Sequence, residues 1–213
     1  MQAIDLEFLS IIKQKYLNLL ESRSYPSYLS DIHQLIPETR QLISSHVFTQ
    51  ISNLLLDESP ELCNIESHYL PAGSPAIPPH QDNFYHCVVN GTGLKVLIPM
   101  SDFSYSNGAL IYLDCPSSIG TMSHLPSSIV NFSAEIDPIL LSSLRCTKTS
   151  YSYRLGDASY HLLNSIHFSY GNTTNIPASF LVYRFQSTKS VVDNNMLETY
   201  QRCYQKHLTL LAT

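Results

Sequence analysis

Apolar residues recur at helical spacing over the first 60 positions and at strand-like spacing after them. An apolar residue at every third or fourth position makes one face of a helix. The first stripe consists of Ile4, Phe8, Ile11, Ile12, Leu19 and Leu20. The second consists of Leu42, Ile43, Val47, Ile51, Leu54 and Leu55, with Pro37 suited to a first turn and Pro60 beyond the end. We therefore expect 1–60 to be helical.

Short apolar runs separated by Gly, Pro, Asn and Ser fill the rest of the chain. Runs of this size and spacing predict the antiparallel strands of a sandwich or barrel. They are 64–70, 94–100, 109–113, 151–155, 158–163, 165–170 and 179–185. The interval 127–146 is predicted to hold a short helix, as an insertion or lid. We expect an α+β, mainly β architecture, with a β core over 61–190, a C-terminal helix in 191–213 and the N-terminal helices packed outside.

Length and charge exclude several classes of protein. A chain of 213 residues predicts a single domain over 1–213. A formal net charge of −5 disfavours binding to nucleic acid. No apolar run approaches the roughly 20 residues of a membrane span, and the first residues lack the basic segment of a signal peptide. We therefore predict no nucleic-acid partner, no membrane contact and a cytoplasmic location.

The cysteines give no sign of a disulfide framework. There are five, at 63, 87, 115, 146 and 203, and no two of them form a CxxC pair. An odd number at wide spacing supports neither a disulfide scaffold nor a zinc knuckle. We expect them to be small buried apolar residues in a reducing compartment.

The peptide PPHQDNFYH, residues 78–86, carries the most informative chemistry. His80 and Asp82 are two positions apart, so in extended backbone both side chains point to one side. His167, in a later β-like run, is the best third ligand, because two strands of a barrel face each other. Two imidazoles and one carboxylate on one face are typical of non-heme Fe(II) sites with open coordination positions. The HxD pair by itself also fits a loop histidine bonded to nearby backbone.

The run from Pro75 to about Phe185 resembles the phytanoyl-CoA dioxygenase-like family of Fe(II)/2-oxoglutarate-dependent oxygenases. The matching segments, in the family's order, are PPHQDNFY at 78–85, LKVLIPMSDF at 94–103, SNGALIYL at 106–113, LGD at 155–157 and HFSYGNTT at 167–174. The resemblance implies a double-stranded β-helix, the cupin-type jelly roll. It also implies that His80, Asp82 and His167 hold Fe(II), with 2-oxoglutarate as cosubstrate and O2 as oxidant. The carboxylate of Asp82 favours hydroxylation over halogenation.

The chain departs from the family at the cosubstrate. The family places an arginine for the distal carboxylate of 2-oxoglutarate 11 residues after the second iron-binding histidine, and here Ala178 stands there. Lys95 is the first alternative cation and Arg184 the second. Lys95 fits an outward-facing lysine on an edge strand equally well, and Arg184 fits a salt bridge at a strand end. By resemblance, Ser169 and Gln81 would also lie near the cosubstrate.

Phe84 and Tyr85 follow the HxD segment and are candidates for the wall of the substrate pocket, with Tyr69 as a weaker one. His161 and His167 are six positions apart and would share a face if one strand ran through both, but the intervening LLNS is expected to break it, and we prefer His167. The family's PGSH segment is replaced by DCPSS at 114–118, so the substrate class does not transfer.

We expect a small-molecule substrate, such as a natural-product intermediate or a modified amino acid. The chain is short for the family, which predicts a trimmed lid or a pocket completed by a second copy in a homo-oligomer. Two alternatives stay open: a cupin-like iron enzyme that does not use 2-oxoglutarate, and a non-catalytic binding module on the same scaffold.

Overall fold

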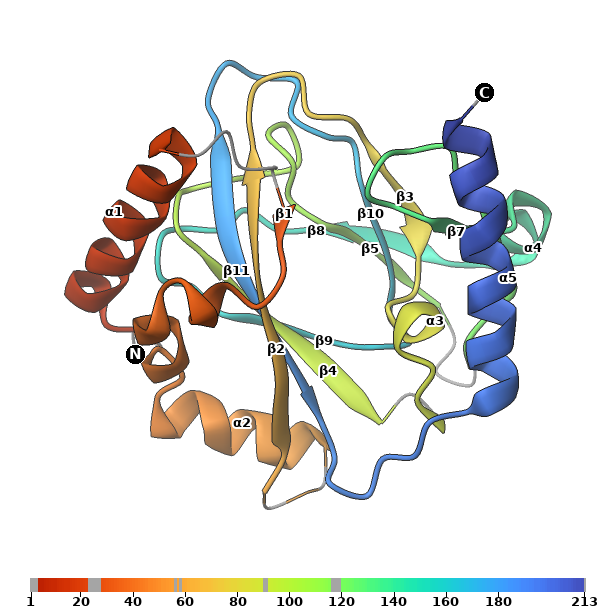
Figure 1. Ribbon diagram of the computed structural model, residues 1–213, viewed down its shortest axis with the longest axis horizontal. Coiled ribbons are helices and arrows are strands. Elements are labelled where there is room, and N and C mark those ends of the chain that lie inside the picture. Colours follow the sequence, from red (N-terminus) through yellow and green to blue (C-terminus); the bar gives the residue numbers. More distant parts are fainter. Residues whose placement is uncertain are drawn as a thin grey trace.

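The computed structural model describes residues 4–22, 28–55, 57, 59–89, 92–115 and 120–212. Two antiparallel sheets form its centre (Figure 1). The first has the strand order β1-β2-β11-β4-β9, and the second has the order β3-β10-β5-β8. A separate pair, β6 and β7, lies beside α5. The arrangement is the mainly β, rolled-sheet architecture that the sequence predicts.

The strands of the larger sheet are β1 (Tyr28–Leu29), β2 (Glu61–Leu70), β11 (Ala178–Gln186), β4 (Gly93–Pro99) and β9 (Ser159–Leu162). Those of the smaller sheet are β3 (Ile77–His80), β10 (Ile166–Ser169), β5 (Ile111–Asp114) and β8 (Thr147–Ser150). The outer pair is β6 (His124–Pro126) and β7 (Ala134–Ile136). The run 151–155 is not a strand, since only Tyr153 bridges to Phe103 there.

The helices differ from the prediction in one respect. α1 (Leu6–Ser22) follows the first apolar stripe, but the second stripe is divided into a 3-10 helix, η2 (Pro37–Gln41), and α2 (Ser45–Leu55). A further 3-10 helix, η1 (Ile32–Gln34), precedes them. The remaining helices are α3 (Asn83–His86), α4 (Pro138–Ser143) and α5 (Asn194–Leu211). Short α4 lies in the interval where we expected a short helix, and α5 lies within 191–213.

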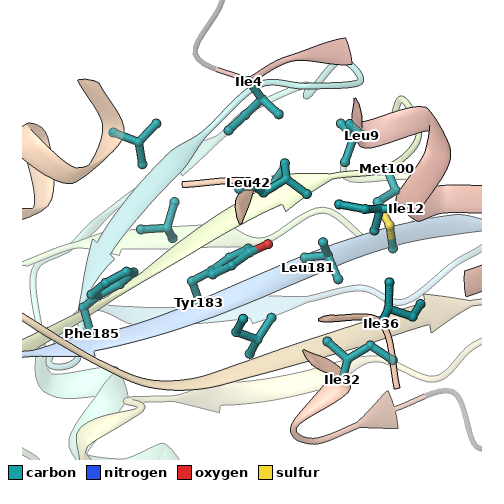
Figure 2. Packing of buried hydrophobic residues seen from close by; sticks show 14 of the residues in the cluster. Ile4, Leu9, Ile12, Ile32, Ile36, Leu42, Met100, Leu181, Tyr183 and Phe185 are labelled. Atoms are coloured by element: carbon teal, nitrogen blue, oxygen red, sulfur yellow. The ribbon is translucent and has the colours of Figure 1, made fainter. Parts of the chain in front are cut away.

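The N-terminal helices cover the outer face of the larger sheet (Figure 1). Side chains alternate between the two faces of a strand, so β11 sends Leu181, Tyr183 and Phe185 into this core (Figure 2). Tyr183 lies deepest and donates a hydrogen bond from its hydroxyl to the carbonyl of Thr39 at 2.7 Å. The alternate residues of β11 therefore point into the space between the sheets.

A disulfide joins Cys115 to Cys146, which corrects the expectation that no cysteines are paired. The reason is the register of β5 and β8, in which Asp114 lies opposite Thr147. One step further along this antiparallel pair places Cys115 opposite Cys146, with a Cα–Cα distance of 4.5 Å that a disulfide spans without distortion. Cys63, Cys87 and Cys203 are free.

Within the part of the chain that the structure describes, none of the helices combines the length and apolar character that a membrane crossing needs. Most of the DCPSS loop, at 116–118, lies outside the described residues.

Candidate metal centre

Strand pairing brings the two predicted histidine ligands together. β3 ends at His80, and the register of β3 and β10 places His167 directly opposite. The two imidazole rings lie with their centroids 4.3 Å apart. Asp82 follows at the start of α3, so its carboxylate is carried to the same place. The three ligand atoms lie within 4.8 Å of one another, and all three residues are buried.

Hydrogen bonds from the rings to backbone carbonyls orient both imidazoles. The Nδ1 atom of His80 bonds the carbonyl of Pro78 at 2.8 Å, and the Nδ1 of His167 bonds the carbonyl of Ser165 at 3.0 Å. A carbonyl accepts only from N–H, so each ring keeps its proton on Nδ1 and presents the lone pair of Nε2. Burial lowers the pKa of both histidines, most strongly for His167, which also lies near His80. Both rings are therefore neutral, as metal binding requires.

The carboxylate of Asp82 is held by a different partner at each oxygen. Oδ1 accepts from the Nζ of Lys95 at 2.9 Å, and Oδ2 lies 3.0 Å from the Nε2 of His161. Oδ2 is also 3.8 Å from the Nε2 of His167, so it is the oxygen that faces the other two ligands. Burial alone would raise the pKa of Asp82, but Lys95 and the histidines hold it well below its usual value. The ligand is ionised.

Lys95 bridges two buried carboxylates. Its Nζ lies 2.9 Å from Asp82 and 3.5 Å from Glu66, which is on β2, two strands away from β4 in the same sheet. Burial opposes the charge of Lys95, but the two carboxylates outweigh it and raise its pKa. Burial likewise opposes the charge of Glu66, yet Lys95 and then His68 lower its pKa to about 2. Lys95 thus faces the interior, and the edge-strand alternative for it is wrong. Neither Glu66 nor this triplet of charges was predicted from the sequence.

His161 belongs to the centre, although we preferred His167 over it. The predicted break at LLNS is present, but it connects β9 in one sheet to β10 in the other, so both histidines point into the same interior. Their ring centroids are 4.7 Å apart. The Nδ1 of His161 lies 3.1 Å from the hydroxyl of Tyr112. His161 therefore connects the carboxylate ligand to Tyr112, a partly buried tyrosine.

A cavity of about 510 Å³ opens at the three ligands between the two sheets. Among the residues that line it, those with a formal charge are Glu66, Asp82, Lys95 and Arg184. These four formal charges cancel. A larger cavity of about 1010 Å³ lies on the other side of His161, along β9 and residues 151–158. It contains none of the three ligands, so the smaller cavity is the candidate site.

Two further predicted residues, Tyr85 and Arg184, also line the smaller cavity. Tyr85 donates from its hydroxyl to the carbonyl of Ala134 at 2.8 Å, which presents its ring rather than its hydroxyl. Phe84 points elsewhere and stacks on His124 with ring centroids 4.2 Å apart. Tyr69 lies on the outer face of β2, against the helices. The structure does not bring Phe84 or Tyr69 to the cavity.

Gln81 and Ser169 are buried but do not line the cavity. The side-chain amide of Gln81 donates to the carbonyls of Gly120 and Asn164, at 3.0 and 2.8 Å, and its oxygen accepts from the backbone of Met122 at 2.7 Å. Ser169 donates to the carbonyl of Gly108 at 3.0 Å and accepts from the backbone of Gly171 at 3.1 Å. Both side chains hold loops in place, and their hydrogen bonds are already made.

The surroundings of Ala178 are apolar. Ala178 is completely buried in a cluster with Phe103, Tyr153 and Phe180. Phe103 stacks on Tyr153 and Phe180, with centroid distances of 4.9 and 5.4 Å. Aromatic and aliphatic side chains therefore pack around the position at which the resembled family has its arginine.

The donor set fits a divalent iron ion. Two neutral imidazoles with free Nε2 atoms and one carboxylate oxygen converge on one side, and the cavity lies on the other. This is the facial arrangement that leaves coordination positions for exchangeable ligands. Among the described residues these three are the group of His, Cys, Asp or Glu side chains close enough to share an ion.

No protein-family model and no curated protein matches the sequence. Solved structures do match the fold. EvdO2 from Micromonospora carbonacea var. aurantiaca, complexed with 2-oxoglutarate, is 17% identical, with a TM-score of 0.71 over 90% of this chain and 86% of EvdO2. EctD from S. alaskensis, with 2-oxoglutarate and 5-hydroxyectoine, is 17% identical, with a TM-score of 0.70 over 89% of this chain and 71% of EctD.

The epimerase SnoN, in complex with Fe3+, alpha ketoglutarate and nogalamycin RO, is 15% identical, with a TM-score of 0.71 over 90% of this chain and 78% of SnoN. The likeness to these three structures confirms the predicted cupin-type, mainly β fold.

Proposed function

We propose that this protein is an Fe(II)- and 2-oxoglutarate-dependent dioxygenase that hydroxylates or otherwise oxidises a C–H bond of a small molecule. The observation that carries the proposal is the buried triad of His80, Asp82 and His167, whose ligand atoms lie within 4.8 Å of one another at the edge of a cavity. The three matched enzymes of the same fold were solved with 2-oxoglutarate bound, one of them also with iron. A place in the phytanoyl-CoA dioxygenase-like family is part of the proposal.

Charge balance supports the choice of cosubstrate. The charged residues of the cavity cancel, so a bound Fe(II) ion leaves two positive charges in a buried site. Buried charges require partners, and 2-oxoglutarate is a dianion. Iron with 2-oxoglutarate and O2 supplies the oxidising chemistry and yields succinate, carbon dioxide and the oxidised substrate. The protein's part is to orient the reactants and exclude water.

The surrounding residues have distinct roles in this proposal. Lys95 holds Oδ1 of Asp82, while Oδ2 bonds His161 and faces His167, so its remaining lone pair would serve the metal as a single-oxygen ligand. The backbone carbonyls of Pro78 and Ser165 keep the two imidazoles in the ligating tautomer. The ring of Tyr85 forms part of the wall against which a substrate would pack.

Anaerobic titration tests the proposal. Fe(II)-loaded protein should develop a weak visible charge-transfer band on addition of 2-oxoglutarate, and O2 should then release succinate. The variant His167→Ala should show neither result. Bound iron with no band would favour a second candidate, a cupin-like iron enzyme that does not use 2-oxoglutarate. The apolar surroundings of Ala178 are the observation that favours this candidate.

Other parts of the proposal come from the sequence. A primary substrate of small-molecule size matches the cavity, and a homo-oligomer that completes the cavity stays a prediction.

The Cys115–Cys146 bond conflicts with a cytoplasmic location, because disulfides persist in oxidising compartments. Thiol labelling of protein from intact cells would test the location, since a labelled Cys115 would restore the cytoplasmic assignment.

A further inference from the structure

The larger cavity, along β9 and residues 151–158, has no role in the proposed reaction. Its volume of about 1010 Å³ is about twice that of the metal cavity and lies at the upper end of the range for small-molecule sites. His161 is the one described residue that lines both cavities, so it forms the wall between them. A molecule bound in the larger cavity is therefore held apart from the three iron ligands.

Tyrosine rings form a continuous wall of the larger cavity. Tyr151 lies between Tyr112 and Tyr153, with ring centroids 6.2 and 6.4 Å away, and all three line the cavity. Tyr151 is 54% exposed and Tyr153 only 5%, so the row runs from the surface into the interior. Aromatic rings pack favourably at such distances, so the ring of a ligand can continue the row.

Two hydroxyl groups at the inner end of this row lack hydrogen-bond partners. The Oη of Tyr153 and the Oγ of Ser159 are buried, and neither has a partner within the described part of the chain. The hydroxyl of Tyr112, in contrast, already bonds the Nδ1 of His161 at 3.1 Å. A buried hydroxyl without a partner is costly, which indicates that a polar group of a ligand completes this end.

The charges around the larger cavity disfavour an anionic ligand. Asp114, Arg154 and Asp157 line it, and all three side chains are exposed. Two acids and one base leave an excess of one negative charge, which repels a carboxylate or a phosphate. A neutral ligand avoids this repulsion.

We propose that the larger cavity binds a neutral phenolic molecule, that is, an aromatic ring that carries a hydroxyl group. Its ring extends the row of Tyr112, Tyr151 and Tyr153, and its hydroxyl bonds Tyr153 and Ser159. A phenol hydroxyl both donates and accepts, so one group serves both partners. The inference does not depend on the proposed function, since the cavity contains none of the iron ligands.

Three naphthalene derivatives test the site: 2-naphthol, 2-methylnaphthalene and 2-naphthoate. They share one ring system and carry a neutral hydroxyl, a methyl group and a carboxylate. The chain contains no tryptophan, so naphthalene fluorescence, titrated with the iron-free protein, gives each Kd without interference from indole. 2-Naphthol should bind about three- to tenfold more tightly than 2-methylnaphthalene, as a neutral hydrogen bond predicts. 2-Naphthoate should bind most weakly.

Tyr153→Phe removes the hydroxyl and keeps the ring that stacks on Phe103. It should weaken 2-naphthol by about three- to tenfold and leave 2-methylnaphthalene within roughly twofold. Ser159→Ala should give a smaller loss in the same direction. Tyr105→Phe, at a tyrosine that is 57% exposed and lines neither cavity, is the matched control and should change neither Kd. Thermal unfolding verifies that each variant is folded.

Equal affinity of the native protein for 2-naphthol and 2-methylnaphthalene would overturn the inference, and so would a Tyr153→Phe variant that keeps the native preference. The metal cavity also contains aromatic rings, so Tyr85→Ala distinguishes the two locations. Loss of 2-naphthol binding in Tyr85→Ala but not in Tyr153→Phe would place the ligand in the metal cavity and contradict the inference. Each of these results leaves the proposed function intact, because the anaerobic titration with iron and 2-oxoglutarate tests it separately.

Discussion

The two ends of β11 face the same interior but have opposite character. At one end Arg184 lies beside Lys95, within a group of charges that includes Glu66 and Asp82. At the other end, Ala178 lies in a buried, apolar cluster that includes the aromatic rings of Phe103, Tyr153 and Phe180. The difference shows that one end of the interior gathers charged side chains and the other is filled by apolar packing. A shared fold therefore does not fix which side chains line its interior.

Loss of the metal ligands should have the largest effect. Asp82→Ala removes the carboxylate and leaves Lys95 with Glu66 as its remaining acidic partner, so iron affinity should fall by at least about 100-fold. Competition with a chromophoric chelator measures the affinity. The matched control is Asp102→Ala, in a loop outside the cavity, which should bind iron as the native protein does. Native affinity in Asp82→Ala would show that iron binds elsewhere.

The next test introduces an arginine at Ala178, the position at which the resembled family carries one. Ala178→Arg forces a guanidinium into a fully buried aromatic cluster, and we expect a loss of about 4 kcal/mol in the free energy of unfolding, from overpacking and an unpaired charge. Urea denaturation measures it. Ala212→Arg, at an exposed position after α5, should be neutral. A stable Ala178→Arg protein with tighter 2-oxoglutarate binding would break the contrast between the two ends.

The disulfide should stabilise the edge formed by β5 and β8. Its sequence separation of 31 predicts that Cys115→Ser with Cys146→Ser lowers the free energy of unfolding by about 4 kcal/mol in the chain-entropy model. Denaturation of the double variant measures the change. Cys63→Ser, at a half-buried free cysteine, is the control and should change stability by less than about 1 kcal/mol. An unchanged free energy of unfolding in the double variant would show that the disulfide does not stabilise the fold.

Acid should lower the free energy of unfolding of the metal-free protein through the ion pair of Glu66 and Lys95. The folded-state pKa of Glu66 is lowered to about 2, so its contribution to stability is complete above the unfolded value of about 4.3 and is lost as pH falls toward 2. The contribution is about 2 to 3 kcal/mol, shared with Lys95. Glu66→Gln should flatten the stability profile between pH 5 and pH 2, whereas Glu61→Gln should not. An identical slope in Glu66→Gln and native protein would contradict this.

The sequence predicted the parts of the site that local pattern determines. His80 and Asp82 are two positions apart, which pointed to a shared site, and His167 followed as the third ligand. The role of His161 was missed because the turn after it changes sheet, which no local period reveals. Glu66 was missed because its partner Lys95 lies on a strand distant in sequence, and a lone acidic residue in a β-like run carries no signal. The cysteine pair depends in the same way on strand register.

Anomalous diffraction at the iron edge, from a crystal of the Fe(II)-loaded protein, would locate the metal. We expect one strong peak bonded to the Nε2 of His80, the Nε2 of His167 and one carboxylate oxygen of Asp82, with open positions facing the cavity. A map with no peak there, or with the peak enclosed by protein ligands on every side, would contradict this expectation.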